Sequence, residues 1–242
     1  MITLNYPQRS IDWITARLWR LTASRMSTVI TSTGKLSRSE AALGAIDKLI
    51  AGIALANVMN ARANEIDGLD DWQLADFMAN FIGDSFKGNR HTRRGEDCEP
   101  DALAALAAKI GMEITEVGMC VMGDCENGVV SCSPDGLIYQ ARKLIAGAEV
   151  KSPCLAVYYG QVARGTLPDD YKLQVHSSMA ICEVDTWHFC SYFAGRPLFH
   201  VEVKRDAFTD TVERSLIEFR DVYAARYEIV TEALATLGKE AA

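Results

Sequence analysis

The chain has 242 residues, of which 49% are apolar, and its formal net charge is −7 at pH 7. This length is sufficient for one domain with a full hydrophobic core, and the apolar content is that of a folded, soluble protein, which excludes a disordered or low-complexity chain. The acidic balance is unusual for a protein that binds nucleic acid, because neutralising phosphates normally requires a basic surface.

The first part of the chain is predicted to be mainly helical. Helices are expected near residues 10–20, 39–63 and 71–82. The longest apolar stretch, residues 41–59, is interrupted by Asp47, Lys48 and Asn57, which predicts an amphipathic core helix rather than a membrane span. Residues 1–7 lack a basic start and a long apolar run, so no secretory signal is evident and a cytoplasmic location is expected.

The rest of the chain alternates between strand and helix patterns. A basic loop at 87–98 precedes a helix at 101–110, which ends at Gly111. The further expected elements are strands at 113–123, 128–133, 136–140 and 146–151, a short helix and loop at 152–168, a helix at 169–182, strands at 186–193 and 197–204, and a helix at 209–238. This order predicts an α/β fold with a mixed central β-sheet flanked by helices.

The last of these helices carries an apolar stripe at spacings of three and four residues. Its members are Val212, Leu216, Phe219, Tyr223 and Tyr227. The stripe is expected to pack on the sheet, and contact with a second subunit is the alternative.

The seven cysteines show no familiar metal-binding pattern. They are Cys98, Cys120, Cys125, Cys132, Cys154, Cys182 and Cys190. An odd, scattered set that lies mostly in apolar segments fits buried thiols in a reducing cytosol. The spacings match neither a zinc ribbon nor the tight downstream trio of an iron–sulfur site, so a structural metal is not expected.

Two short segments contain residues in a pattern typical of a catalytic site. Ser133-Pro134-Asp135-Gly136-Leu137 is followed, after a short gap, by Glu149-Val150-Lys151, and both have strand-like flanks. Paired in a hairpin, they would bring Asp135 and Glu149 side by side. Glu149 and Lys151 would point to one face of their strand, with Val150 pointing into the core. This pattern resembles the PD-(D/E)xK nuclease core.

Asp135, Glu149 and the Val150 carbonyl would make an all-oxygen pocket suited to Mg²⁺, with Mn²⁺ as a substitute. A metal there would polarise a scissile phosphate and lower the pKa of a bound water. Lys151 would orient or deprotonate that water or offset charge on the phosphorane, and a role as base would need its pKa lowered well below about 10.4. The alternative is an ordinary Pro-Asp-Gly turn beside a solvated Glu-x-Lys pair.

Four motif segments stand in order along the chain. They are Trp13-Ile14-Thr15-Ala16-Arg17 with Leu21-Thr22-Ala23-Ser24, then Gly95-Glu96-Asp97-Cys98-Glu99, then Cys132-Ser133-Pro134-Asp135-Gly136-Leu137, and last Tyr171-Lys172-Leu173-Gln174-Val175. Together they resemble the lambda exonuclease and YqaJ-like viral recombinase family, which are phage recombination exonucleases of the PD-(D/E)xK superfamily.

The resemblance implies a role for each remaining catalytic candidate. Glu99 would complete the acidic site, Lys151 would position the nucleophilic water, and Gln174 would support it. Pro100 follows Glu99 directly, and proline is comfortable only in the first turn of a helix. The helix is therefore expected to begin after Pro100, with Glu99 at or near its N-terminus.

The resemblance also assigns the terminal 5′-phosphate of DNA to Arg17 and Ser24, with Ser133 as a further phosphate contact. Arg20 and Arg25 flank this segment. A second basic group lies just ahead of residue 99 and comprises Lys87, Arg90, His91, Arg93 and Arg94. A positive channel inside an acidic outer surface would reconcile these residues with the net charge.

The implied activity is that of a Mg²⁺-dependent 5′-to-3′ exonuclease on linear double-stranded DNA with 5′-phosphate ends. It would release mononucleotides and leave 3′ single-stranded tails for recombination by strand annealing. The resemblance further implies a processive homotrimer ring and a single-strand annealing recombinase as partner, with a phage or prophage gene expressed in a bacterial host cell. One domain is expected, with a mainly helical DNA-end-binding part at 1–90, a nuclease core at 91–205 and a C-terminal helix at 206–242.

Two alternatives remain open. One is an endonuclease of restriction or repair type on the same core. The other is a non-catalytic DNA-end-binding module. A pocket for a free 5′-phosphate serves no purpose in an enzyme that cuts internally, so the segment with Arg17 and Ser24 separates the first alternative from an exonuclease.

Overall fold

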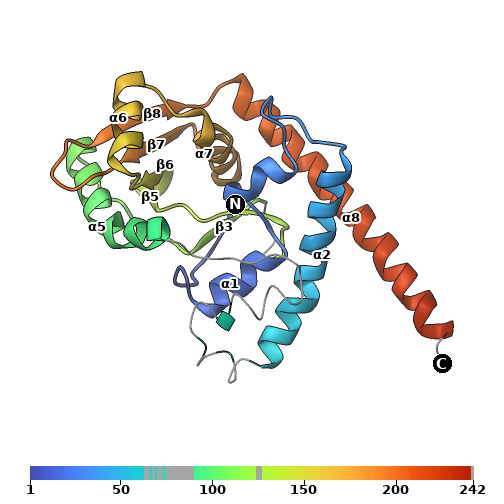
Figure 1. Ribbon diagram of the computed structural model, residues 1–242. Helices are drawn as coiled ribbons and strands as arrows, with labels where there is room; N and C mark the ends of the chain where they lie inside the picture. The colour runs from blue at the N-terminus through green and yellow to red at the C-terminus, as the bar shows by residue number, and fades with distance from the viewer. Residues whose placement is uncertain (63–65, 67–68, 70–72, 75–89, 124–126, 241–242) are drawn as a thin grey trace.

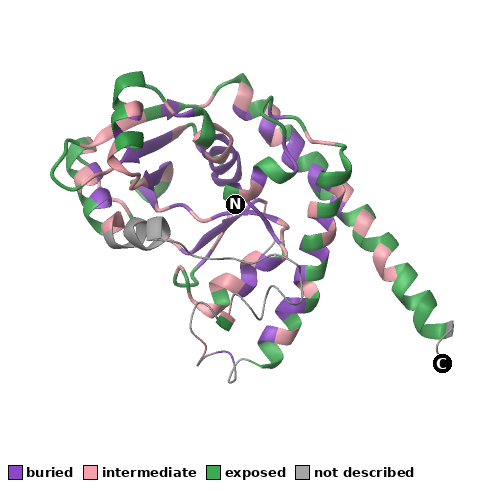
Figure 2. Ribbon diagram, viewed as in Figure 1, coloured by how far each residue is buried: buried purple, intermediate pink, exposed green. Residues whose placement is uncertain are grey.

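The computed structural model describes residues 1–62, 66, 69, 73–74, 90–123 and 127–240, with the backbone alone at 90–97 and 240. Two four-stranded sheets form the centre of the molecule, and helices surround them (Figure 1). Buried residues concentrate on the strands and on the inner faces of the helices (Figure 2). The predicted α/β class is confirmed, although the strands divide between two sheets.

The first sheet joins the N-terminus to the middle of the chain. It contains β1 (Ile2–Leu4), β3 (Met119–Val121), β4 (Val130–Cys132) and β2 (Leu21–Thr22), in the order β1-β3-β4-β2. Only the pair β2–β4 is parallel. β3 and β4 fall inside two predicted strands, whereas β1 and β2 were not predicted. They have three and two residues, too few to show an alternating pattern.

The second sheet holds the acidic motif. It contains β5 (Gly136–Gln140), β6 (Lys143–Lys151), β7 (Thr186–Ser191) and β8 (Phe199–Lys204), in that order. β6 pairs antiparallel with β5 and parallel with β7. The turn before β6 is formed by Ala141 and Arg142, which both have positive φ angles. Gly147 lies inside β6, where the Trp187 ring occupies the space that a side chain would need.

Three helices flank this second sheet: α5 (Arg90–Ile110), α6 (Leu155–Arg164) and α7 (Asp169–Cys182). The expected basic loop and the start of α5 after Pro100 are wrong, since Pro100 lies inside a helix that begins at Arg90. Proline removes one helical hydrogen bond. Downstream of it, however, α5 buries Ala102, Leu103 and Leu106 in a cluster with β6, which offsets that loss. The predicted end at Gly111 is confirmed by its φ of +69°.

The remaining helices are α1 (Ile11–Leu18), the 3-10 helix η1 (Ala23–Thr28), α2 (Glu40–Ala61) and α8 (Ala207–Glu240). Ser10 and Ser39 cap α1 and α2, each accepting a backbone hydrogen bond at 3.2 Å. The predicted helix at 71–82 lies outside the described residues except at 73–74. Among the described helices, α2 alone is long and apolar enough to cross a membrane, and it packs against α1, η1 and α8.

The apolar stripe of α8 is buried in a core cluster that also contains strand residues of both sheets, and its neighbouring helices are α7 and α2. Val212, Leu216, Phe219 and Tyr223 are buried, and Tyr227 is 40% exposed. α8 contacts α7 and α2, and α7 in turn contacts strands of both sheets. The C-terminal half of α8 projects from the body of the molecule (Figure 1).

The crossing of α1 and α2 depends on Gly52. A Cβ atom at this position would lie 2.3 Å from the carbonyl oxygen of Leu18, whereas Gly44 on the same helix has nothing within 4 Å. We expect Gly52→Ala to lower the free energy of unfolding by roughly 1–3 kcal/mol through overpacking. Gly44→Ala should raise it by up to about 1 kcal/mol through helix propensity. Urea denaturation checks both values, and equal effects would contradict the close crossing.

Candidate active site

The β5–β6 hairpin brings the two carboxylates of the motif together, as predicted. Gly136 pairs with Ala148, so the preceding Asp135 and the following Glu149 lie opposite each other. The backbone N–H of Asp135 donates to the Ala148 carbonyl at 3.2 Å. In return, the N–H of Val150 donates to Asp135 Oδ2 at 2.5 Å. Asp135 is thereby fixed against the peptide backbone that separates Glu149 from Lys151.

The surroundings of Asp135 oppose the negative charge of its carboxylate. Glu149 is 2% exposed. Burial, and then the charge of Glu149, raise the pKa of Asp135 well above its usual range, and Glu99 contributes in the same direction. A divalent cation between the Asp135 and Glu149 carboxylates would offset their negative charge. Oxygen donors of this kind suit Mg²⁺ or Mn²⁺.

Lys151 and Gln174 converge on one oxygen of Glu149. The Lys151 ammonium forms an ion pair with Glu149 Oε1, and Gln174 Nε2 donates to the same atom at 2.6 Å. Burial alone would lower the pKa of Lys151, but the charges of Glu149 and Asp135 raise it above its usual value. The lowered pKa that a role as general base would need is therefore not found, and Lys151 is a positively charged hydrogen-bond donor to Glu149.

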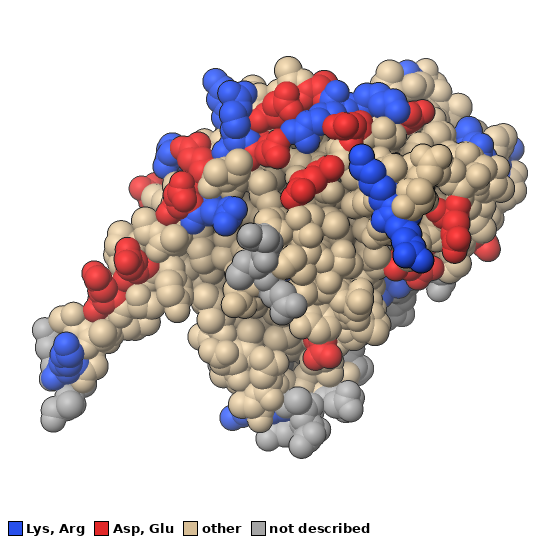
Figure 3. All heavy atoms as spheres, turned by 180° about the vertical axis from the view of Figure 1, so that it is seen from behind, with Lys and Arg blue, Asp and Glu red and all other residues tan. Residues whose placement is uncertain are grey.

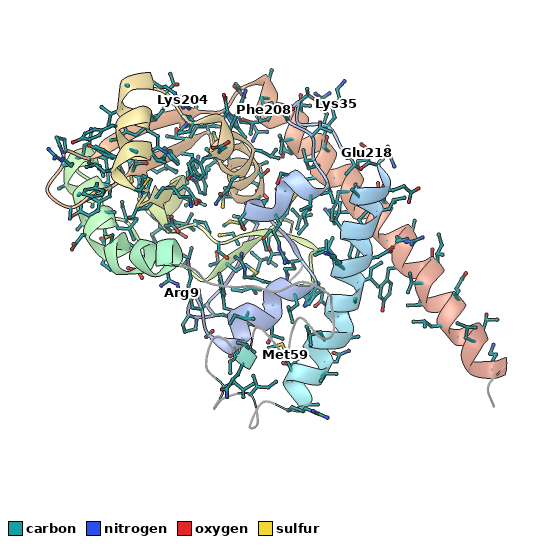
Figure 4. The ribbon with its side chains drawn as sticks, in the orientation of Figure 1. Arg9, Lys35, Met59, Lys204, Phe208 and Glu218 are labelled. Atoms are coloured by element: carbon teal, nitrogen blue, oxygen red, sulfur yellow. The ribbon has the colours of Figure 1, made fainter. Side chains whose placement is uncertain are left out.

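Glu99 reaches the site from α5 and has a partner that the sequence did not suggest. Arg9 Nη2 donates to Glu99 Oε2 at 2.7 Å, and the two side chains are 49% and 21% exposed. Arg9 has a φ of +70°, an uncommon backbone conformation for a residue other than glycine. It lies between α5 and α1 (Figure 4). No motif included Arg9, although it stands four residues before Trp13.

A second cluster lies beside the first and contains all three predicted phosphate-binding residues. Arg17 donates to Ser133 Oγ at 3.0 Å and to Ser24 Oγ at 3.4 Å. Trp13 Nε1 also donates to Ser133 Oγ, at 3.1 Å, and the Arg17 guanidinium stacks 4.1 Å from the centroid of the Trp13 ring. Ser133 precedes Asp135 by two residues, so the two clusters are joined through the motif itself.

The electrostatics of Arg17 favour an anionic ligand. Burial, and then the charge of Arg25, lower the pKa of Arg17 to about 10. Glu149 acts on it in the opposite direction, which places the guanidinium near the carboxylates. Arg20, expected to flank a phosphate, is instead a structural residue: it is buried and donates to the carbonyls of Ala16 and Gly128 at 2.5 and 3.0 Å.

Two further residues, Gln8 and Tyr171, complete the surroundings of the site. Gln8 Nε2 donates to the carbonyls of Val117 and Pro134, both at 2.9 Å, and so anchors the residue before Asp135. The Tyr171 ring centroid lies 5.5 Å from Lys151 Nζ. The sequence analysis did not identify Gln8 as a site residue, because a single glutamine forms no recognisable pattern. Tyr171, in contrast, lies inside one of the recognised motifs.

The basic group ahead of Glu99 is not placed: Lys87 and the side chains of Arg90, His91, Arg93 and Arg94 lie outside the described residues. On the rear face, acidic and basic side chains are intermixed rather than gathered into a basic patch (Figure 3).

His176, which follows Gln174 by two residues, is 3% exposed and hydrogen-bonds to Thr209 at 2.7 Å, so its role is packing.

Comparisons with known proteins concern the family and the fold of the chain. The sequence model of the YqaJ-like viral recombinase domain matches residues 12–185. The alkaline exonuclease LHK-Exo from Laribacter hongkongensis is similar in structure, with 21% identity, a TM-score of 0.67, and coverage of 94% of this chain and 100% of that one. LHK-Exo in complex with dAMP gives 22% identity, a TM-score of 0.69 and the same coverage.

A phage-related exonuclease from Haemophilus somnus 129PT is more distant. It shares 14% identity, with a TM-score of 0.50 and coverage of 88% of this chain and 96% of that one. No curated protein matches the sequence.

Proposed function

Because the chain belongs to the YqaJ-like viral recombinase domain family, we propose that it is a Mg²⁺-dependent exonuclease that degrades one strand of linear duplex DNA from its 5′-phosphate end. It releases mononucleotides in the 5′-to-3′ direction and leaves 3′ single-stranded tails. One observation carries the proposal: the carboxylates of Asp135 and Glu149 adjoin a cluster in which Arg17 donates to both Ser24 and Ser133.

Asp135, Glu149 and the Val150 carbonyl would hold the metal ion, and Mn²⁺ would substitute for Mg²⁺. When bound, the ion polarises the scissile phosphate and lowers the pKa of a water. Lys151 stays protonated, orients the attacking water and compensates negative charge. Gln174 holds Glu149 in place through its hydrogen bond of 2.6 Å. Glu99 adds a further carboxylate, for a metal-bound water or a second ion.

The neighbouring pocket would hold the terminal 5′-phosphate. Arg17 provides a forked donor that suits a phosphate, and the hydroxyls of Ser24 and Ser133 already lie on either side of it. A phosphate there takes over hydrogen bonds that these three residues otherwise make with one another. Since Ser133 precedes Asp135 by two residues, a phosphate in this pocket places the first phosphodiester close to the metal ligands.

The proposal also includes the domain organisation, oligomeric state, partner and location that the family resemblance implies. Residues 1–90 form the DNA-end-binding part, 91–205 the nuclease core and 206–242 the C-terminal helix of one domain. Three copies form a ring around DNA, which makes degradation processive. A single-strand annealing recombinase is the partner that loads onto the 3′ tail. The protein acts in the cytoplasm of a bacterial host, encoded by a phage or prophage, without a membrane partner.

The deciding experiment compares three substrates in the presence of Mg²⁺. These are linear duplexes with 5′-phosphate ends, the same duplexes with 5′-hydroxyl ends, and closed circles, each labelled on one strand. Mononucleotides from the phosphorylated ends, with intact circles, are expected. Cut circles would favour an endonuclease of restriction or repair type. Binding of ends without any cleavage would favour the non-catalytic DNA-end-binding module.

Arg17→Ala should act selectively on phosphorylated ends. Loss of charge-assisted hydrogen bonds to the phosphate is expected to lower cleavage from 5′-phosphate ends by roughly 10- to 100-fold. Cleavage from 5′-hydroxyl ends should change little, which initial rates on the two substrates measure. Arg38→Ala is the control, because Arg38 is exposed and paired with Glu218 away from the site. Equal losses on both kinds of end would argue against a phosphate pocket at Arg17.

A further inference from the structure

Three cysteines from distant parts of the sequence meet in the core. Cys120 lies on β3 and Cys132 on β4, where they are direct cross-strand partners, and Cys182 is the last residue of α7. Their Sγ atoms all lie within 4.8 Å of one another, and those of Cys132 and Cys182 are 3.5 Å apart. The three residues are 0%, 1% and 2% exposed.

The thiols of this cluster interact with one another. Hydrogen bonds from Cys132 and Cys182 lower the pKa of Cys120, so that its sulfur carries negative charge more readily than an ordinary thiol. Burial and these neighbours raise the pKa of Cys132. A thiolate that accepts hydrogen bonds from two thiols forms with them a set of three sulfur ligands that still carries two protons. A metal ion can bind the same three sulfurs by displacing those protons.

We propose that Cys120, Cys132 and Cys182 form a buried binding site for one Zn²⁺ ion, separate from the catalytic metal. Sulfur atoms at the usual Zn–S distance of about 2.3 Å from a tetrahedral ion lie about 3.8 Å apart. The closest pair of the cluster is already inside that distance, and the others lie within 4.8 Å. A displacement of under about 1 Å would bring the sulfurs into coordination geometry.

Thiolate ligands and the charge of the core together select the ion. Sulfur donors prefer Zn²⁺ or Cu⁺ over Mg²⁺, which takes oxygen. Three thiolates leave one negative charge around Zn²⁺ and two around Cu⁺, and the smaller residual charge costs less to bury. Thr3, the cross-strand partner of Cys120, hydrogen-bonds to its sulfur. The fourth, oxygen position of a tetrahedral site would therefore fall to this hydroxyl or to a water.

A Zn²⁺ ion at this site would have a structural role next to the proposed active site. It ties β3 and β4 to α7, the helix that carries Gln174. Cys132 directly precedes Ser133 and the acidic motif. Spacing along the sequence gave no indication of this site, because its ligands are brought together by the pairing of β3 with β4 and by the packing of α7 on both strands.

Metal content and a thiolate-specific spectrum test the proposal without relying on nuclease activity. Protein prepared with reductant and Zn²⁺, then dialysed, is expected to retain one zinc per chain by elemental analysis. Titration of the metal-free protein with Co²⁺ should produce the sulfur-to-metal charge-transfer absorption of thiolate coordination, which carboxylates do not give. Zn²⁺ should displace the Co²⁺, and excess Mg²⁺ should not.

Single substitutions locate the ligands. Cys120→Ala, Cys132→Ala and Cys182→Ala should each abolish the charge-transfer band, whereas Cys190→Ala, a buried cysteine outside the cluster, should retain it. Zn²⁺ should raise the Tm of the wild type and of Cys190→Ala only. Circular dichroism identifies variants that fail to fold, and the wild-type titration still decides the question in that case.

Three results would overturn the proposal. The first is folded wild-type protein that takes up neither Zn²⁺ nor Co²⁺ through sulfur. The second is a folded cluster variant that keeps the full charge-transfer band. The third is a Cys132–Cys182 disulfide recovered from metal-free protein that cannot be metallated after reduction. None of these bears on the exonuclease proposal, whose test uses DNA cleavage and Mg²⁺.

Discussion

Lys151→Ala is expected to abolish DNA cleavage while the binding of DNA ends survives. The Lys151 ammonium pairs with Glu149 and keeps its proton because both carboxylates raise its pKa. Its removal eliminates the positive charge that would orient the water and balance the phosphorane. The loss of a preorganised donor of this kind lowers kcat by about 10²–10³-fold. Single-turnover cleavage at saturating Mg²⁺ measures the rate, and a gel-shift assay in Ca²⁺ measures binding.

The control for this variant is Lys172→Ala. Lys172 lies one residue after Tyr171 on α7, but its ammonium packs 4.4 Å from the centroid of the Phe208 ring. We expect the control to cleave DNA at close to the wild-type rate. A cleavage rate of Lys151→Ala within about tenfold of the wild-type rate would show that Lys151 has no catalytic role. The rate loss would then be smaller than the loss caused by removing a single transition-state hydrogen-bond donor.

Asp135→Asn should eliminate cleavage and change how stability depends on pH. The partly buried Asp135 carboxyl has a raised pKa in the folded protein, so between about pH 4 and that raised value the folded state binds more protons than the unfolded state. The free energy of unfolding of the metal-free wild type should therefore fall as the pH rises through this window. Asp135→Asn has no carboxyl at residue 135 to titrate in this pH range. Its free energy of unfolding should therefore fall less steeply with pH than that of the wild type.

Urea denaturation at a series of pH values, with and without Mg²⁺, checks both parts of this prediction. Mg²⁺ should stabilise the wild type at neutral pH and have little effect on Asp135→Asn. Cleavage by the variant should fall by about 10³-fold or more, because a metal ligand is lost. Asp170→Asn is the matched control, since Asp170 is exposed in the first turn of α7. Equal stabilisation of wild type and Asp135→Asn by Mg²⁺ would place the metal elsewhere.

The strands of the second sheet and helix α7 followed from the sequence, because their signals are local and strong. α7 was predicted with its observed bounds, from Asp169 to Cys182. The proximity of Asp135 and Glu149 was predicted from two segments short enough to form one hairpin, which the observed register confirms. The convergence of Arg17 and Ser24 with Ser133 came from the family resemblance alone, since these residues lie on separate elements.

The parts that were missed depend on tertiary contacts. β1 and β2 are strands only because β3 and β4 pair with them. The Ala141–Arg142 turn uses residues without turn preference, held by the hairpin on both sides. Pro100 was given too much weight as a helix start, because the packing of the residues after it on β6 is not visible in a one-dimensional pattern. Arg9 acquires its partner through the same helix.

The parallel pairing of β6 with β7 has a consequence for synthesis on the ribosome. β5 and β6 emerge together and pair through a two-residue turn, but β6 has only this one neighbour until Ser191 of β7 has been made. Contacts between distant segments form late in folding, and Gln174 is also absent from shorter chains. A nascent chain therefore contains the acidic motif well before it has an assembled site, so that cutting of DNA would have to await a nearly complete polypeptide.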